Sequence, residues 1–320
     1  MSSTVRQKRL VAALASLAAL VFPASGADAH GGTRAAETCA GQIPTMGTDP
    51  DNPDGMASFE GTPGDDVILI VTDDIGNKDL GQFSVDVSAF GGDDVICVRN
   101  NDDSGTKQIS IYVDAGDGDD FVKIPRAGNE TPRSNYVIQY AEDLDLDMRT
   151  GPSGLALSGV GGGTGTIQGG TGPNKTDLSV HAGGTVKVDL KEQFLKSGGG
   201  RYTVRNIRHV SASANKLVMT GDHRANWFVV GRTTCKAVLK GGKGRDRLFA
   251  TDVHDYGLRA QRACRKTRVL YGQDGDDKLG GSVYSDRIIG GPGTDITDAG
   301  GGFDTCRTVE VIRSNSCERT

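Results

Sequence analysis

A nine-residue rhythm of polar and apolar positions runs through the carboxyl-terminal part of the chain. Aspartates recur at Asp277, Asp286, Asp295 and Asp304, and the position two residues after each is Leu, Ile, Thr or Cys. Glycines recur among the positions that precede each aspartate, which gives the template G-G-x-G-x-D-x-U-x, with U a large apolar residue. An apolar residue that returns at a short fixed interval between glycine-rich turns predicts a stack of short strands.

Isolated copies of the same motif lie further towards the amino terminus. Asp66, Asp94 and Asp120 follow one another at intervals close to the length of three nonapeptides, and the interval from Asp246 to Asp277 is slightly longer. These longer spacings predict one such turn in each large coil of a three-sided β-helix. The nine-residue spacing predicts a compact β-roll, in which two nonapeptides complete one coil.

Between these regions, residues 125–240 keep the strand-like pattern without the acidic motif. The runs 185–190, 216–220 and 227–230 alternate or cluster apolar residues as short strands do. Asn226 occupies the aspartate position of a degenerate copy. We interpret this stretch as further coils of one solenoid, with a separate β-sandwich as the alternative. Residues 190–196 and 259–266 are the two places where a short turn of helix is expected.

Composition supports a thin core. Glycine accounts for 47 of the 320 residues, aromatic residues for 5%, and tryptophan occurs once. A chain of this kind cannot build a thick globular core around large side chains. Short stacked strands are one way to fold it, and disorder is the other. The regular placement of Val, Ile and Leu favours folding.

The four in-phase copies resemble the RTX, or haemolysin-type, calcium-binding nonapeptide. The resemblance covers residues 241–306 well and residues 61–122 in patches. It implies an all-β fold, a right-handed parallel β-helix or β-roll solenoid, with Ca²⁺ as the ligand. In that family each loop supplies half of the calcium shell and the equivalent loop one coil later supplies the rest. Carried onto this chain, the resemblance pairs Asp277 with Asp295 and Asp286 with Asp304.

The residue types suit calcium, a hard cation that takes six to eight oxygen ligands. Glycines such as Gly275 and Gly293 let the backbone turn its carbonyl groups towards an ion. The Asp286 site is expected to be the weaker one, because Ser282 and Tyr284 replace glycines of the template.

In the amino-terminal part, Asp66, Asp94 and Asp120 are expected to stack in adjacent coils and to hold one or two more ions. The acids directly before them, Asp65 and Asp93 among them, are either ligands or solvated charges. Around Asp246 the basic neighbours disfavour a cation. The plain alternative for all these loops is a tight turn in which Asp hydrogen-bonds its own backbone.

The amino terminus has the features of an export signal. Residues 1–29 combine a basic start, an apolar run at 10–22 and the small residues Ala27 and Ala29. Six cysteines in an exported chain predict three disulfides, and sequence proximity suggests Cys39–Cys97, Cys235–Cys264 and Cys306–Cys317, although other connectivities remain open. We therefore expect a secreted, extracellular protein with no membrane span. RTX toxins and proteases usually lack such a leader, so their activities are not carried over.

The chain shows no motif of an enzyme, and we expect that it is not one. The histidines do not form H-E-x-x-H, and no serine lies in G-x-S-x-G. Two alternatives stay open: a carbohydrate-active β-helix enzyme such as a polysaccharide lyase or epimerase, and an adhesive or structural stalk. An acidic net charge of −5 disfavours nucleic acid and suits cations. The expected partners are calcium ions and, as a candidate, a cell-surface polysaccharide, with the protein a monomer.

The expected domain order follows from these features. A signal peptide (1–29) precedes amino-terminal coils with isolated motifs (30–124) and degenerate coils (125–240). A calcium-binding β-roll (241–305) and a disulfide-closed cap (306–320) complete the chain.

Overall fold

The computed structural model describes residues 38–47, 56–71, 82–99, 108–124, 135–139, 141, 143–147, 154–159, 162–169, 177–231, 234–250, 268–313 and 317–319. These residues contain no helix and form two sheets, in which parallel pairing dominates. The expectation of an all-β protein is confirmed. The segments 1–29 and 259–266, for which a leader and a helical turn are expected, lie outside the described residues.

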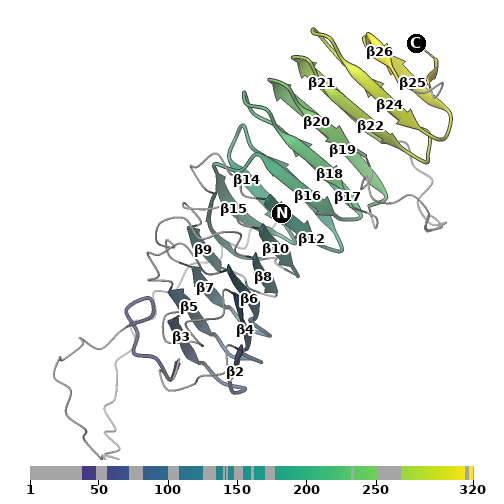
Figure 1. The fold of residues 1–320 in the computed structure, drawn as a ribbon. Helices are drawn as coiled ribbons and strands as arrows, with labels where there is room; N and C mark the ends of the chain where they lie inside the picture. The colour runs from purple at the N-terminus through teal and green to yellow at the C-terminus, as the bar shows by residue number, and fades with distance from the viewer. Residues whose placement is uncertain are drawn as a thin grey trace, which may run out of the picture. The chain divides into compact units, whose positions relative to one another are not determined.

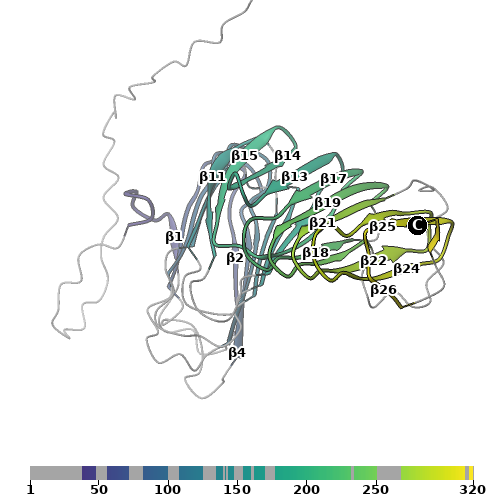
Figure 2. The same cartoon turned by 90° about the horizontal axis from the view of Figure 1, so that it is seen from above.

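The chain passes back and forth between the two sheets (Figures 1 and 2). Sheet 1 holds 15 strands in the order β1(Met46–Gly47), β3(Val67–Val71), β5(Val95–Arg99), β7(Phe121–Ile124), β9(Asp143–Asp147), β11(Thr164–Gln168), β15(Gly200–Arg205), β14(Phe194–Ser197), β13(Thr185–Asp189), β17(Lys216–Thr220), β19(Lys236–Lys243), β21(Val269–Asp274), β23(Arg287–Ile289), β25(Asp304–Arg307) and β27(Cys317–Arg319). Sheet 2 holds 12 strands in the order β2(Met56–Glu60), β4(Gln82–Ser88), β6(Gln108–Asp114), β8(Asn135–Gln139), β10(Gly154–Ser158), β12(Asp177–His181), β16(His209–Ser213), β18(Trp227–Val230), β20(Arg247–Phe249), β22(Lys278–Ser282), β24(Ile296–Gly300) and β26(Val311–Ile312).

One passage through both sheets is called a circuit below. The outgoing edge is where the chain leaves sheet 1 for sheet 2, and the return edge is where it comes back. Because strands of successive circuits pair in parallel, equivalent loops of successive circuits lie next to each other along each edge. Figure 2 shows the two layers, with β17 and β19 in one and β18 and β22 in the other.

The core consists of rows of aliphatic side chains, one from each circuit. Ile68, Ile96, Val122 and Leu144 follow one another across β3, β5, β7 and β9, and all are fully buried. The strands alternate buried and partly exposed positions, as in β13 and β17. A medium-sized aliphatic side chain in each row is enough to fill the space between the sheets, which is why so few aromatic residues are needed.

The length of a circuit differs between the two ends of the chain. In the carboxyl-terminal part a circuit takes 18 residues, as from Asp277 to Asp295. Two nonapeptides therefore complete one circuit, as the nine-residue spacing predicts. In the amino-terminal part the circuit from Asp66 to Asp94 takes 28 residues. The described residues there provide two strands per circuit rather than three, and the connecting segments 72–81 and 100–107 lie outside them.

The strand register agrees with these circuit lengths. Leu270, Ile288 and Cys306 are register neighbours in β21, β23 and β25. Ile68 pairs in the same way with Ile96 across β3 and β5. One apolar position of each circuit therefore returns to the same row of the core, whichever length the circuit has.

Sheet 1 carries one irregularity at β13, β14 and β15. β14 pairs antiparallel with both of its neighbours, β13 and β15. The chain therefore makes three strands in sheet 1 between β12 and β16, which are adjacent strands of sheet 2. The expected helical turn over 190–196 is wrong: residues 190–193 form a turn that is not helical, and β14 follows it. Leu195 is fully buried and pairs with Tyr202, so a position in the core favours the strand. The strands expected near 185–190, 216–220 and 227–230 are confirmed as β13, β17 and β18.

Disulfides close both ends of the described chain. Cys39 is bonded to Cys97 and Cys306 to Cys317, which confirms two of the expected pairs. Cys235 is also disulfide-bonded, and its expected partner Cys264 lies outside the described residues. Within the described ranges, no helix has the length and hydropathy needed to cross a membrane.

Candidate metal-binding loops along the two edges

On the outgoing edge, the sixth residues of the nonapeptide-like loops form a row. The backbone N–H of Asn226 donates to Asp246 Oδ1 at 2.7 Å, that of Asp246 to Asp277 Oδ1 at 2.8 Å, and that of Asp277 to Asp295 Oδ1 at 2.9 Å. The row ends at Glu310, whose carboxylate accepts the N–H of Asp295 at 2.7 Å. Asp277 and Asp295 therefore lie in adjacent circuits, hydrogen-bonded to each other.

The return edge carries two rows of the same kind. In the amino-terminal part the N–H of Asp66 donates to Asp94 at 2.8 Å, and that of Asp94 donates to Asp120 at 2.9 Å. In the carboxyl-terminal part the N–H of Asp286 donates to Asp304 at 2.7 Å. The backbone N–H of Asp304 in turn donates to the Glu318 carboxylate. The structure thus brings together every aspartate pair that the spacing predicts.

The loops fall into two classes according to their second residue. In six loops this residue has a left-handed backbone, as Gln273 (φ 75°) and Gly291 (φ 127°) do. In the same six loops one carboxylate oxygen of the sixth residue is buried and accepts no hydrogen bond. We call these the open loops. Their sixth residues are Asp94, Asp120, Asp246, Asp277, Asp295 and Asp304.

In the other three loops, the closed loops, the sixth residue is satisfied from within. The Ser282 N–H and hydroxyl donate to Asp286 Oδ2 at 2.6 and 2.8 Å. The Thr62 N–H and hydroxyl donate to Asp66 Oδ2 at 2.6 and 2.9 Å. The Asn226 side-chain oxygen accepts the N–H of Asp222, the second residue of its loop, in the same way. A left-handed second residue points its N–H elsewhere: that of Gln273 donates to the Gly290 carbonyl of the next circuit at 2.8 Å.

The open-loop aspartates are buried among like charges. Asp94, Asp120, Asp277, Asp295 and Asp304 are fully buried. Burial, together with the charges of Asp246 and Asp295 and opposed by the hydrogen bond from the preceding circuit, raises the pKa of Asp277 to about 7. Burial likewise raises the pKa of Asp94, Asp246 and Asp304 to about 6. A buried carboxylate oxygen without a partner is costly, so the site favours protonation or a bound cation.

Asp286 differs from these residues in its charge environment. Arg268 occupies the equivalent position one circuit earlier, and its N–H donates to Asp286 Oδ1 at 3.2 Å. Burial raises the pKa of Asp286, but hydrogen bonds from Ser282 and Arg268 and the Arg268 charge oppose that rise. A neighbouring guanidinium and two internal donors leave this carboxylate little need for a metal ion.

The fourth-position glycines bring successive loops close together. Gly275 (φ 135°) and Gly293 (φ 144°) are left-handed. A Cβ on Gly275 would overlap the Gly244 carbonyl oxygen, and one on Gly293 would overlap the carbonyl oxygen of Gly275. Glycine is required at these positions because both the backbone angle and the space exclude a side chain. A carbonyl oxygen of one loop consequently lies against the glycine of the next.

The acids at the fifth position form a second, exposed row. Asp65 Oδ1 accepts the N–H of Asp93 at 2.9 Å, and Asp93 Oδ1 accepts that of Asp119 at 3.0 Å. They therefore brace adjacent circuits from the outside.

The structure changes the ranking of the candidate residues. Asp246, which its basic neighbours made a poor candidate, lies in an open loop between Asn226 and Asp277 and belongs to the outgoing row. Asp66 and Asp286 lie in closed loops, so each carboxylate is already satisfied. The sequence signal that separates the classes is the second residue, where a hydroxyl such as that of Thr62 or Ser282 closes the loop.

No group of three or more His, Cys, Asp or Glu side chains in the described part of the chain is placed to hold a metal ion. A cation at these edges would therefore need backbone carbonyls together with one or two carboxylates. That donor set is composed entirely of oxygen, which suits calcium.

Comparison with known proteins adds no relative. The chain matches no protein-family model and no curated protein.

Proposed function

We propose that this chain is a secreted calcium-binding protein whose open loops hold Ca²⁺ between adjacent circuits. The observation that carries the proposal is the set of six buried, unpartnered carboxylate oxygens, each on a row of aspartates in successive circuits. Such oxygens are normally satisfied in a folded protein, and a bound cation would satisfy them. We further infer that the two sheets are the walls of a right-handed β-roll of the RTX type.

The best sites in this proposal lie between two adjacent open loops. Three such pairs exist among the described residues: Asp94 with Asp120, Asp246 with Asp277, and Asp277 with Asp295. Each pair would offer two buried carboxylates and the carbonyl oxygens of its left-handed glycines. The Asp286–Asp304 pair joins a closed loop to an open one and would bind more weakly. The role proposed is structural and binding rather than catalytic.

Calcium would also stabilise the fold in this proposal. Without an ion, stacked carboxylates about 5 Å apart repel one another across the strand spacing. A cation that binds only the folded state shifts the unfolding equilibrium by mass action. Ordering of the carboxyl-terminal array and calcium binding are therefore expected to be coupled.

Isothermal titration with CaCl₂ on the chain without residues 1–29 tests the proposal, with circular dichroism recorded in calcium and in chelator. The expected result is heat of binding at more than one site and a strand signal that strengthens with calcium. MgCl₂ is the comparison, because magnesium demands stricter geometry and gives up its waters reluctantly. Absence of calcium binding, with a melting curve that is the same in chelator, would rule the proposal out.

A further inference from the structure

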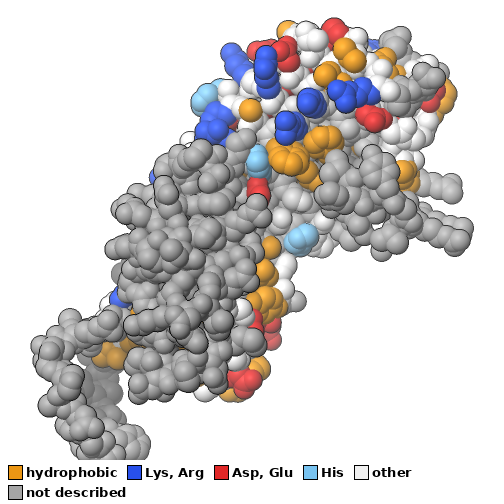
Figure 3. All heavy atoms as spheres, viewed as in Figure 1, with side chains coloured by type: hydrophobic (Ala, Val, Ile, Leu, Met, Phe, Trp, Pro, Cys, Tyr) orange, Lys and Arg blue, Asp and Glu red, His pale blue; other side chains and the backbone are white. Residues whose placement is uncertain are grey.

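Charge is strongly segregated along the chain. Residues 37–184 contain 25 Asp and Glu against eight Lys and Arg, whereas residues 185–250 contain four Asp and Glu against 14 Lys and Arg. The modest net charge of the whole chain conceals this division. In the view of Figure 3, Lys and Arg side chains gather on the surface over the carboxyl-terminal strands. A basic surface of this density attracts anions.

A groove of about 720 Å³ opens in this basic region, beside the outgoing edge. Its walls are the turn after β13, the end of β15 with the residues after it, the loop that follows β17, and the ends of β19 and β21. The three-strand irregularity explains its position. Two additional strands widen sheet 1 by roughly 10 Å relative to sheet 2 at this point, since neighbouring strands lie about 4.8 Å apart.

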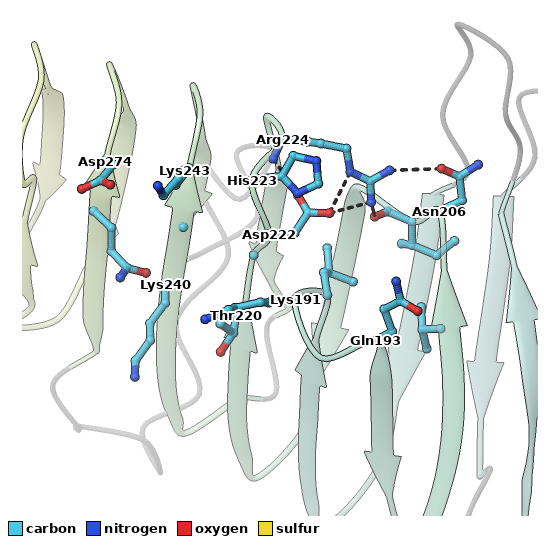
Figure 4. Close-up of a pocket in the computed structure, with 16 residues that line it drawn as sticks. Lys191, Gln193, Asn206, Thr220, Asp222, His223, Arg224, Lys240, Lys243 and Asp274 are labelled. Carbon is cyan, nitrogen blue, oxygen red and sulfur yellow. Dashed lines mark hydrogen bonds and ion pairs between the residues drawn. The ribbon is translucent and has the colours of Figure 1, made fainter.

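Three lysines line the groove and have no partner of opposite charge. Lys191, Lys240 and Lys243 are exposed, and none of them forms an ion pair or a side-chain hydrogen bond among the described residues. Figure 4 shows them around the same hollow, Lys191 on the turn after β13 and both Lys240 and Lys243 on β19. Three free ammonium groups around one groove form a site for negatively charged groups.

One acid of the lining is already neutralised, whereas the other is the register neighbour of Lys243. Asp222 accepts two hydrogen bonds from Arg224, at 2.8 Å from its N–H and at 2.7 Å from Nε. The guanidinium continues to Asn206 Oδ1 at 3.1 Å, so the pair is held along one rim of the groove (Figure 4). Asp274 is the other acid of the lining, beyond Lys243.

The rest of the lining suits a sugar. Gln193 and Thr220 offer amide and hydroxyl groups, while Leu190 and Ile207 of the lining are almost fully buried. Sugar rings present hydroxyl groups at their edges, so these polar side chains fit them. Cationic side chains by themselves would bind any anion, with or without a sugar.

The positive charge also extends beyond the groove, across the face of sheet 1. Lys187, Lys196 and Arg201 are register neighbours on β13, β14 and β15. Their charged groups lie 4.7, 5.7 and 4.1 Å from the centre of the Phe194 ring. Cations repeated from strand to strand match a ligand that carries negative charges along its length.

We propose that this groove binds an anionic polysaccharide, with Lys191, Lys240 and Lys243 contacting its carboxylate or sulfate groups. The groove adjoins the open loops of Asp246 and Asp277, whose second residues Gly242 and Gln273 line it, but the lysines rather than the loop carboxylates would contact the glycan. Carboxylated and sulfated glycans share the chemistry that the lysines recognise, so the test includes one polymer of each kind.

The experiment measures binding of fluorescein-labelled dextran sulfate and polygalacturonate by fluorescence anisotropy, on the chain without residues 1–29. Unmodified dextran is the neutral control and polyglutamate the anionic control without sugar. Dextran sulfate is measured in calcium. Polygalacturonate is measured without calcium, which cross-links it, in a salt concentration at which circular dichroism shows the strands intact.

The decisive variant is K191Q/K240Q/K243Q. Its control is K123Q/R307Q/R313Q, which removes the same charge outside the groove. We expect the groove variant to weaken binding of at least one anionic glycan by about tenfold or more, equivalent to about 1.4 kcal/mol. The control variant should stay within about twofold of the parent.

Four results would overturn the proposal: equal losses in the two triple variants, equal binding of dextran, equal lysine-dependent binding of polyglutamate, or salt-sensitive self-association in place of glycan binding. Calcium titration of K191Q, whose lysine lies outside the open loops, should match the parent and separates this outcome from failure of the calcium proposal.

Discussion

The outgoing and return edges of the carboxyl-terminal array use the same nonapeptide and arrive at different chemistry. On the outgoing edge three successive loops, with Asp246, Asp277 and Asp295, leave a buried carboxylate oxygen without a donor. On the return edge Asp286 is satisfied by Ser282 and lies beside Arg268.

From Arg268 and Asp277 onward, both edges have the same strand register and the same circuit length of two nonapeptides. The difference comes from one residue, the second of the loop, and from the direction of its N–H. The lesson is that the aspartate places a carboxylate in the row, while the second residue decides whether that carboxylate still needs a cation.

The largest effect should come from D277N compared with D286N. Asparagine keeps an oxygen that can accept the N–H of the preceding circuit but removes the charge. We expect D277N to abolish most of the calcium-induced rise in Tm and yet to melt no lower than the parent in chelator, since a buried unpaired charge is lost. D286N should lower Tm in both conditions, because it weakens bonds that already exist.

Differential scanning calorimetry in calcium and in chelator measures both variants. Equal behaviour of D277N and D286N would remove the distinction between open and closed loops.

The next effect concerns pH. The pKa of Asp277 in the fold is about 7 and that of Asp94, Asp246 and Asp304 about 6, above their value of 3.8 in an unfolded chain. The folded state therefore binds more protons than the unfolded state between these values, and its stability falls as pH rises.

Calcium-free protein should lose Tm from about pH 4 to about pH 7, most steeply near pH 5, where all four carboxyls are protonated in the fold and ionised in the unfolded chain. Saturating calcium should flatten or reverse this trend. A calcium-free Tm that rises over the same pH range would contradict the burial of charged carboxylates.

A smaller effect is expected from opening a closed loop. S282G removes the hydroxyl that donates to Asp286, which should cost about 1–2 kcal/mol of unfolding free energy in chelator. If the second residue controls calcium binding, added calcium should restore part of the lost unfolding free energy. T62G provides the same test at the amino-terminal end. S285G is the matched control, because its hydroxyl accepts the N–H of Phe303 and does not contact the sixth-position carboxylate.

The smallest effect is expected at the exposed fifth-position row. D119N should change both Tm and calcium affinity little, within about 0.5 kcal/mol. Asp119 is the last acid of that row, and its N–H rather than its carboxylate makes the contact with Asp93. A loss of calcium binding in D119N as large as that in D277N would move the metal from the inner row to the outer one.

The sequence by itself determined the period, the stacking and the partners within each row. A fixed interval of nine residues and an apolar residue two places after each Asp are local patterns, and parallel pairing converts them directly into Asp277 beside Asp295 and Asp286 beside Asp304. The disulfides that close both ends also followed from the spacing of the cysteines.

Only the tertiary structure decided which carboxylates lack a donor and where the basic groove lies. An open loop depends on the backbone angle of one residue: Phe90 and Gln273 are left-handed although neither is glycine. The groove depends on a strand, β14, that inserts antiparallel into sheet 1. Both features arise from contacts between residues distant in sequence, and a local pattern carries no record of such contacts.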